Sequence, residues 1–304
     1  MEAKRALARA AAVVMLVLWG VVGAWGADTV AVVLSRDLPA YQAARNGFAA
    51  TIKERQPGLK LHYLDASQTR SLAAVVKAKG ANLVFAIGTE AAQALKSCGL
   101  PMVFVMVVDP AQAGLSGNCT GVTLKVPVSE QFRLIKATLP KAREVGVLYN
   151  PARSGSIVRE GQAAAASYGL HLRCIEVASE SDLPRAAEKV KGVNLIWATL
   201  DATVYGSHSA KYVLQFALRN SIPVMGFSPN IVEAGALFAA YPDFTDIGRQ
   251  GAGLVLRVLS GEPAGAIPVA APSRVATAVN LRVAESLHIS LPAAFTRQAD
   301  VRYQ

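Results

Sequence analysis

Cysteine, charge and aromatic side chains are all scarce in this sequence. Its 304 residues include 3 cysteines, 17% charged residues and 7% aromatic residues. So few cysteines exclude a disulfide-stapled scaffold, and no C-x-x-C or H-x-x-x-H spacing indicates a zinc site. The low charge, combined with 52% apolar residues, excludes extended disorder. The length is sufficient for two hydrophobic cores of ordinary domain size.

Long apolar runs are also missing beyond the N-terminus. The single long run, residues 10–22, follows a basic stretch and ends in small residues suited to cleavage after Gly26. This layout predicts a secretory signal peptide over residues 1–26. The alternative is an uncleaved N-terminal anchor, for which the run is short. We therefore expect an exported chain located in the periplasm.

The charge that is present is predominantly positive. Lysine and arginine number 31 against 21 acidic residues, for a formal charge of +10. The basic residues are scattered, and no helix-turn-helix, aromatic RNA-binding motif or long basic run accompanies them. The charge therefore indicates a solvated basic surface, and no nucleic-acid partner is expected.

Short apolar runs alternate with amphipathic stretches along the whole chain. Near-continuous apolar runs are typical of strands that helices cover on both faces, and glycine or proline punctuates the helical stretches between them. This alternation predicts an α/β fold with doubly wound, parallel, Rossmann-like sheets. The predicted strands are 30–34, 83–88, 102–108, 145–149, 195–200 and 223–227, and the predicted helices are 41–55, 71–79, 130–139, 157–168, 183–190 and 205–218.

The pattern occurs twice, once from residue 29 to about residue 124 and again from residue 144. Polar turns follow the strands in both halves. In a doubly wound sheet such turns share the carboxyl edge, where ligands bind. Two facing edges would form a cleft for a small polar solute.

Several segments, in this order along the chain, carry a family resemblance: 88–94, 108–111, 118–122, 146–151, 235–237, 247–251 and 279–281. The sequence resembles the substrate-binding proteins of ABC transporters of the tryptophan/tyrosine type, which have the periplasmic-binding-protein type I fold. The resemblance implies a two-lobed receptor that closes on an amino acid or related small zwitterion or carboxylate and docks on a membrane permease. It also implies three crossings between discontinuous lobes, with residues 27–125 and about 244–272 in lobe 1, and 126–243 and about 273–304 in lobe 2.

The family's ligand-contacting turns correspond to residues 154–156 and 200–203. Here Gly155, Leu200 and Ala202 stand where many relatives carry asparagine, threonine and asparagine. Asp201 could bind a ligand ammonium group or cap the next helix, and Tyr241 could stack on a ligand or pack between lobes. The predicted ligand-binding residues are Ser35, Thr89, Glu90, Ser154, Ser156, Asp201, Thr203, Ser228, Asn230 and Tyr241.

The cysteines allow two interpretations. Cys98 and Cys119 each precede a predicted strand, so a disulfide between them is geometrically feasible in an oxidising compartment. The alternative is three free thiols, with Cys174 in an apolar stretch.

Catalytic motifs are absent from the sequence. The four histidines are dispersed, and neither a G-x-S-x-G elbow nor a G-x-G-x-x-G or Walker loop is present. We therefore expect a monomeric, non-enzymatic binding protein without cofactor or metal. Two alternatives remain, a periplasmic sensor or accessory protein of the same fold and, more distantly, an exported α/β hydrolase.

Overall fold

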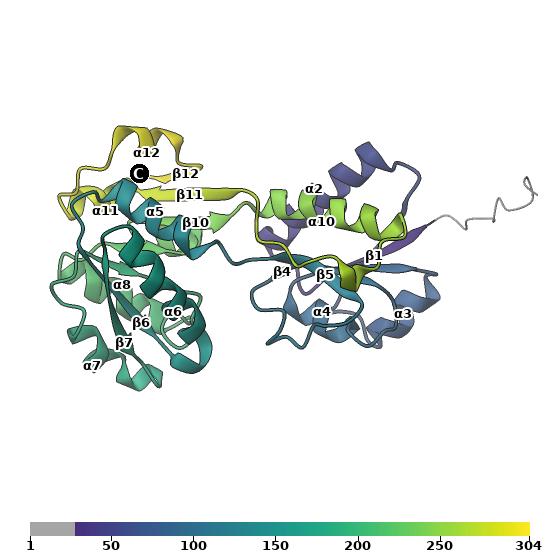
Figure 1. The fold of residues 1–304 in the computed structure, drawn as a ribbon, viewed down its shortest axis with the longest axis horizontal. Helices are drawn as coiled ribbons and strands as arrows, with labels where there is room; N and C mark the ends of the chain where they lie inside the picture. Colours follow the sequence, from purple (N-terminus) through teal and green to yellow (C-terminus); the bar gives the residue numbers. More distant parts are fainter. Residues whose placement is uncertain (1–27) are drawn as a thin grey trace, which may run out of the picture.

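The computed structural model describes residues 28–304, so the signal peptide predicted over residues 1–26 lies outside the described residues. The chain forms two α/β lobes placed side by side along the longest axis of the molecule (Figure 1). The sheet of the first lobe is entirely parallel and has the strand order β2-β1-β3-β4-β5. Its strands are β1 (Thr29–Leu34), β2 (Lys60–Asp65), β3 (Leu83–Ile87), β4 (Met102–Val107) and β5 (Cys119–Thr123).

Helices cover both faces of this first sheet, because β1, β3 and β4 are almost entirely apolar and are buried at every position. One core lies under α2 and α10 and the other under α3 and α4. The helices are α2 (Pro39–Arg55), α3 (Leu72–Ala78), α4 (Thr89–Leu95) and α10 (Phe244–Leu259).

The second lobe repeats this topology and extends it. Its strand order is β12-β11-β10-β9-β8-β6-β7, so five of its strands follow the same doubly wound order as the first sheet. The strands are β6 (Glu144–Tyr149), β7 (His171–Glu176), β8 (Leu195–Trp197), β9 (Val224–Gly226), β10 (Phe238–Pro242), β11 (Val275–Asn280) and β12 (Val301–Tyr303).

Helices again form a layer on each face of the second sheet. The first layer is α5 (Val128–Thr138), α6 (Pro151–Ser167), α11 (Leu281–Ser286) and α12 (Ala293–Gln298). The second layer is α7 (Leu183–Glu188), α8 (Ser209–Arg219) and α9 (Pro229–Glu233). Short 3-10 turns lie at Glu180–Asp182 and Ala264–Ala266.

The predicted fold class is confirmed, with three local corrections. Strand β11 runs antiparallel to β10, because the chain re-enters the second sheet from the first lobe. Helix α6 begins at Pro151 and not at residue 157, since Asn150 caps it and proline suits its first position. Helix α8 begins at Ser209 and not at residue 205, because a run of turns precedes it.

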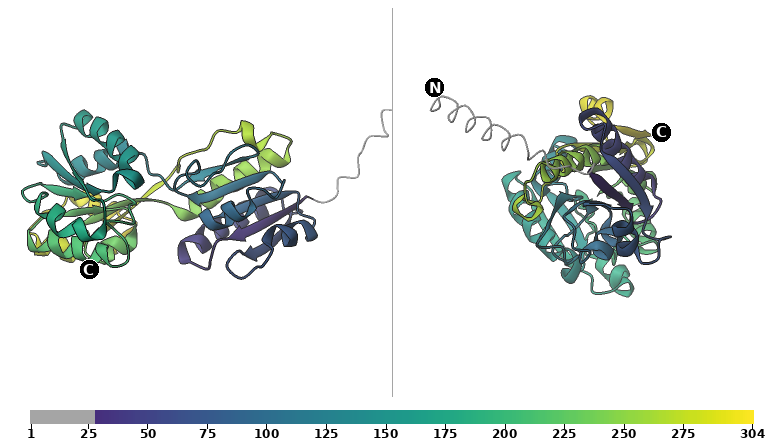
Figure 2. Two further views of the ribbon diagram at one scale, coloured as in Figure 1. Left: turned by 90° about the horizontal axis from the view of Figure 1, so that it is seen from below. Right: turned by 90° about the vertical axis from the view of Figure 1, so that its right-hand side faces the viewer.

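The chain crosses between the lobes in three places, and Figure 2 shows that these crossings form a narrow waist. One crossing lies between β5 and α5, one between β10 and α10, and one before β11. The last two are tied together, because the Asp243 N–H donates to the Arg274 carbonyl and the Arg274 guanidinium lies 3.2 Å from the Asp243 carboxylate. The residue limits predicted for the lobes stay a prediction.

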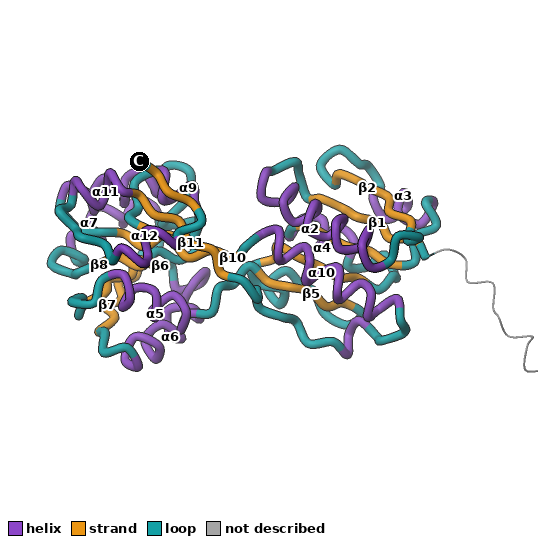
Figure 3. Tube along the Cα trace, turned by 90° about the horizontal axis from the view of Figure 1, so that it is seen from above, coloured by secondary structure: helices purple, strands orange, loops and turns teal. Residues whose placement is uncertain are grey.

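Helix α10 follows a strand of the second sheet but packs in the first lobe, directly on α2 (Figure 3). The two backbones approach closely. A Cβ atom on Gly248 would lie 1.9 Å from the Ala44 carbonyl oxygen, and one on Gly47 would lie 2.0 Å from the Thr245 carbonyl oxygen. The absence of side chains at these two positions therefore allows α10 to seat against α2.

None of the helices between residues 28 and 304 is both long enough and apolar enough to span a bilayer.

The α2–α10 contact predicts opposite effects for two glycine substitutions on the same helix. Gly248→Ala should lower the free energy of unfolding by about 2 kcal/mol or more, because the new methyl group has no room. Gly253→Ala, where a Cβ would meet nothing within 4 Å, should raise it by about 0.5–1 kcal/mol through higher helix propensity. Urea denaturation measures both, and equal effects would contradict the close approach.

Candidate functional site

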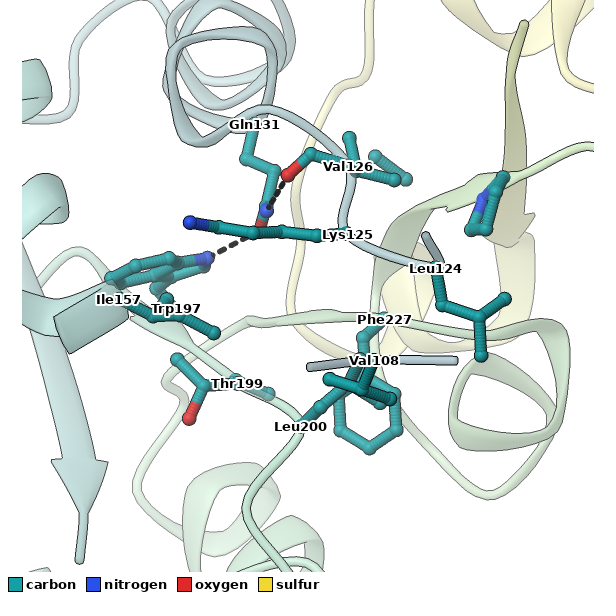
Figure 4. A pocket seen from close by; sticks show the side chains of 13 residues that line it. Val108, Leu124, Lys125, Val126, Gln131, Ile157, Trp197, Thr199, Leu200 and Phe227 are labelled. Atoms are coloured by element: carbon teal, nitrogen blue, oxygen red, sulfur yellow. Dashed lines mark hydrogen bonds between the residues drawn. The ribbon is translucent and has the colours of Figure 1, made fainter. Parts of the chain in front are cut away.

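A pocket lies at the waist, where residues from both lobes and from the crossings meet (Figure 4). Its enclosed volume is about 40 Å³. Val108 and Leu124 line it from the ends of β4 and β5, and Leu200 and Phe227 line it from the ends of β8 and β9. The pocket therefore lies at the carboxyl edges of both sheets, where doubly wound folds bind ligands.

The walls of this interlobe pocket are mainly apolar. Val108 and Leu200 stand on opposite lobes and are 36% and 41% exposed, although large apolar side chains are normally buried. Phe227 lies beside them and is half-buried. Exposed apolar side chains that line one pocket from two lobes favour a ligand with an apolar part.

Position 108 owes its placement to an irregularity in β4. The register between β4 and β5 shifts between Val105 and Val107, and Met106 has a left-handed φ of 62°. A bulge of this kind redirects the residues that follow it. It places Val108 beyond the sheet edge, in the wall of the pocket.

One side of the pocket is fixed by a short chain of hydrogen bonds. The Trp197 indole Nε1–H donates to Gln131 Oε1 over 2.7 Å, and Gln131 Nε2 donates to the Val126 carbonyl over 3.0 Å. These bonds hold the side chains of Trp197 and Gln131 in place. They connect β8 and α5 to the first crossing between the lobes.

The charged lining residue is also engaged. Lys125 Nζ lies 2.5 Å from Glu160 Oε2 of α6. Because the ammonium group already has a carboxylate partner, the pocket presents no free charge of its own.

Unlike Trp197, Gln131 and Lys125, Thr199 has a polar group without a partner among the described residues. It lines the pocket, is 4% exposed, and its hydroxyl has no hydrogen-bond partner within residues 28–304. A buried hydroxyl without a partner is energetically costly, and such a group in a binding pocket is suited to a ligand atom.

The predicted residues of lobe 1 lie at the carboxyl edge of the first sheet, but not in the pocket. The Ser35 hydroxyl is buried and accepts a hydrogen bond from the Ala91 N–H, so it caps α4. Thr89 is the first residue of α4. Glu90 pairs with Arg36 at 2.5 Å. Burial raises the pKa of Glu90, but hydrogen bonds from its own backbone and from Arg36 outweigh burial and hold that pKa below its usual range.

Asp201 and Ser154 are brought together in lobe 2. The Asp201 carboxylate is 2% exposed and accepts three hydrogen bonds, from the Ser154 hydroxyl at 2.5 Å, the Asn150 N–H at 2.7 Å and the Thr203 N–H at 2.9 Å. Because α6 begins at Pro151, Ser154 faces the lobe interior, whereas Ser156 is exposed. The carboxylate thus fixes the turns after β6 and β8 to each other.

The remaining predicted residues lie after β9 and in β10. Ser228 caps α9 by accepting from the Ile231 N–H, and Asn230 is exposed on that helix. Tyr241 is buried, and its ring centroid lies 6.0 Å from that of Phe244. This placement agrees with the interpretation that Tyr241 packs between the lobes. Burial, reinforced by the carboxylates of Asp300 and Asp243, raises the pKa of Tyr241 to about 12.

None of the ten predicted side chains is among those that line the interlobe pocket within the described chain. The residues that line the pocket were not distinguishable in the sequence. Val108, Leu200 and Phe227 end the apolar runs predicted as strands 102–108, 195–200 and 223–227, whereas the strands themselves end at residues 107, 197 and 226.

The three cysteines are free thiols in the described structure, as in the second of the two interpretations, and no Cys98–Cys119 disulfide is formed there. Cys98 and Cys119 contact the same hydrophobic cluster, but the Cys119 thiol donates to the Ser116 carbonyl. Burial raises the pKa of the Cys119 and Cys174 thiols. Among residues 28–304, no three His, Cys, Asp or Glu side chains gather closely enough to ligate a metal ion.

Two doubly wound sheets with a pocket at their facing carboxyl edges define a class, the two-lobed binding proteins of the periplasmic-binding-protein type I fold. The family model described as "ABC transporter substrate binding protein" matches residues 29–302. The chain belongs to this family.

Known relatives agree with this assignment. A tyrosine-binding protein of Clostridioides difficile is 24% identical over 251 residues, which cover 76% of this chain and 72% of that protein. A conserved domain protein of Vibrio cholerae superposes with a TM-score of 0.65 at 27% identity, covering 91% of this chain and 100% of that one. An ABC domain in complex with L-Trp from Streptococcus pneumonia superposes with a TM-score of 0.67 at 24% identity and the same coverage.

The hydrogen bonds of Asp201 predict a structural role for this carboxylate. Asp201→Ala should lower the free energy of unfolding by about 2–4 kcal/mol, because it leaves buried donors without acceptors. Ser154→Ala removes one of the three bonds and should cost about 1 kcal/mol. Urea denaturation compares them. Wild-type stability of Asp201→Ala would contradict the structural role.

Removing the unpartnered hydroxyl of Thr199 should change the free energy of unfolding in the opposite direction. Thr199→Val should raise the free energy of unfolding of the ligand-free protein by about 1 kcal/mol, since it replaces a buried unsatisfied hydroxyl by a methyl group. Thr199→Ser is the matched control, because it keeps the hydroxyl and loses the methyl group. A valine variant less stable than the serine variant would show that the hydroxyl is already satisfied.

Proposed function

We propose that this protein is the exported receptor of an ABC importer, and that it captures a small amino acid or related zwitterion in the pocket between its lobes. Its membership in the substrate-binding family supports the transport role. The observation that carries the choice of site is the apolar pair Val108 and Leu200, exposed on opposite lobes and lining one pocket.

The proposed ligand carries an apolar side chain. The interlobe pocket offers apolar walls, one unpartnered hydroxyl at Thr199 and no free charge. A sugar would bring many hydroxyl groups that such walls cannot satisfy, and burying them unpaired is costly. An aliphatic or aromatic amino acid places its side chain here at no such cost.

The charged ends of a zwitterion would meet the rims of the two sheets. Helix α6 is 17 residues long and begins at the carboxyl edge of the second sheet, so its dipole adds partial positive charge to this rim, where Asp201 and Asn150 already accept its first donors. Ser156, the sixth residue of α6, is exposed in the second turn of that helix. Glu90 is exposed at the facing edge of lobe 1 and is an acceptor suited to an ammonium group. Thr89, Thr203 and Asn230 complete the proposed rim.

Closure would couple binding to transport. A ligand that touches both lobes stabilises the closed form by its higher affinity for that form. The three crossings are the segments able to bend, and the Lys125–Glu160 and Asp243–Arg274 pairs restrain them on either side. We propose that the closed monomer, in the periplasm, is the form that docks on the membrane permease, without any catalytic step.

A thermal-shift screen of the common amino acids tests the proposal. Ligand raises stability by RT ln(1 + [L]/Kd), which is about 2.7 kcal/mol at a hundredfold excess over Kd. Amino acids with apolar side chains should raise the melting temperature in a concentration-dependent manner. Failure of every amino acid to do so would refute the proposed ligand class.

The pocket itself is tested with two leucines of similar exposure. Leu200→Asp should weaken binding of the amino acid by about tenfold or more, because it places a carboxylate against the ligand's apolar part. Leu218→Asp, which alters a 44% exposed leucine on α8, should leave the affinity unchanged. Calorimetry measures both affinities. Equal effects of the two substitutions would remove the interlobe pocket from the proposal.

A further inference from the structure

A second cavity lies at the opposite end of lobe 2, on the amino edge of the second sheet. It has a volume of about 630 Å³, far more than the interlobe pocket. The segments that follow α5, α8 and α11 line it, together with the residue pair that precedes β8. This cavity takes no part in binding the proposed transport ligand.

The polar side chains of this distal cavity are chiefly hydrogen-bond donors. Lys141 and His288 line it, together with hydroxyl groups, and neither forms an ion pair within residues 28–304. No aspartate or glutamate is among the described lining residues. The Asn194 Oδ1 atom already accepts from the N–H groups of Arg143 and Glu144, which leaves its amide donors for the cavity.

Backbone hydrogen bonds close the ends of α8 and α11 at this cavity. At the end of α8 the Ile222 N–H donates to the Ala217 carbonyl, and at the end of α11 the Ile289 N–H donates to the Ala284 carbonyl. Each of these bonds satisfies one of the carbonyl groups that a helix C-terminus exposes. The complementarity of the cavity to a ligand that accepts hydrogen bonds therefore rests on the side chains of Lys141, His288 and Asn194.

Two lining residues hold strained backbone conformations. Ser221 and His288 each follow a helix C-cap with a φ of 53°, a left-handed region that favours glycine. Glycine occupies the same position after α3, α6 and α10, at Gly80, Gly169 and Gly261. Both positions therefore keep a side chain at a conformational cost, and both lie at the same cavity. This indicates that the two side chains serve a function at the cavity.

A buried hydroxyl gives independent support. Thr138, the last residue of α5, lines the cavity and is 1% exposed. Its hydroxyl has no hydrogen-bond partner in the described part of the chain. A buried polar group without a partner is rare in folded proteins and calls for a missing partner.

The remaining lining is apolar. Leu139, Pro140, Val193, Pro223 and Ile289 form the walls between the donors. We propose that this cavity binds a small organic anion with an apolar body, namely an aliphatic monocarboxylate. The carboxylate lies against Lys141 and His288, and the hydrocarbon chain lies on the apolar walls.

Hexanoate is the probe that tests this site, with hexan-1-ol as its uncharged counterpart. Titration of the ¹⁵N-labelled protein should shift the backbone amides of Lys141, Asn194 and His288 in a saturable manner, and hexan-1-ol should bind about tenfold more weakly. Absence of saturable shifts at this cavity would overturn the proposal. So would shifts confined to the interlobe pocket, or equal binding of the alcohol.

Variants separate a ligand role from a structural one. Lys141→Ala should weaken hexanoate binding about tenfold, whereas Lys79→Ala, which removes an exposed lysine from the other lobe, should not. His288→Gly should raise the melting temperature, because glycine relieves the left-handed strain, and should also weaken hexanoate binding. Unchanged affinity in both Lys141→Ala and His288→Gly would overturn the assignment.

Discussion

The contact between α2 and α10 is the constraint on which the architecture depends. Two helices far apart in sequence meet with their backbones almost touching, at positions that tolerate only glycine. Because α10 is held in the first lobe while β10 before it and β11 after it belong to the second sheet, the chain must cross the waist twice more after its first passage. The triple crossing between the lobes is therefore a consequence of how one helix packs.

The waist that results is where the two carboxyl edges face each other. Most polar side chains close to these edges are engaged in holding the edges in shape: Ser35 caps α4, and Asp201 ties the turn after β8 to the start of α6. The pocket lining that remains is a set of apolar side chains and the buried, unpartnered hydroxyl of Thr199. Rigid polar rims around an apolar centre suit recognition of an amphipathic solute.

The fold was accessible from the sequence because buried parallel strands leave continuous apolar runs, and β1, β3 and β4 appear as such runs. The site was less accessible. Serine, threonine and aspartate at a strand end can cap a helix or bind a ligand with equal ease, and for Ser35, Ser154 and Asp201 the difference depends on donors distant in sequence. Val108 was hidden for another reason, since the bulge at Met106 that exposes it follows from register and not from residue type. The antiparallel entry of β11 likewise depends on the return from lobe 1.

The seating of α10 on α2 also governs the order in which the molecule can be assembled. A ribosome delivers the strands of the first sheet early, but the helix that completes one face of its core is synthesised only after nearly all of the second lobe. Contacts between such distant segments form slowly, because a long loop must close before they can contribute. The first lobe to be synthesised is therefore the last to be finished, and until then the apolar face of its sheet under α10 is covered only in part, by α2. A chain of this design benefits from remaining unfolded until its synthesis is complete.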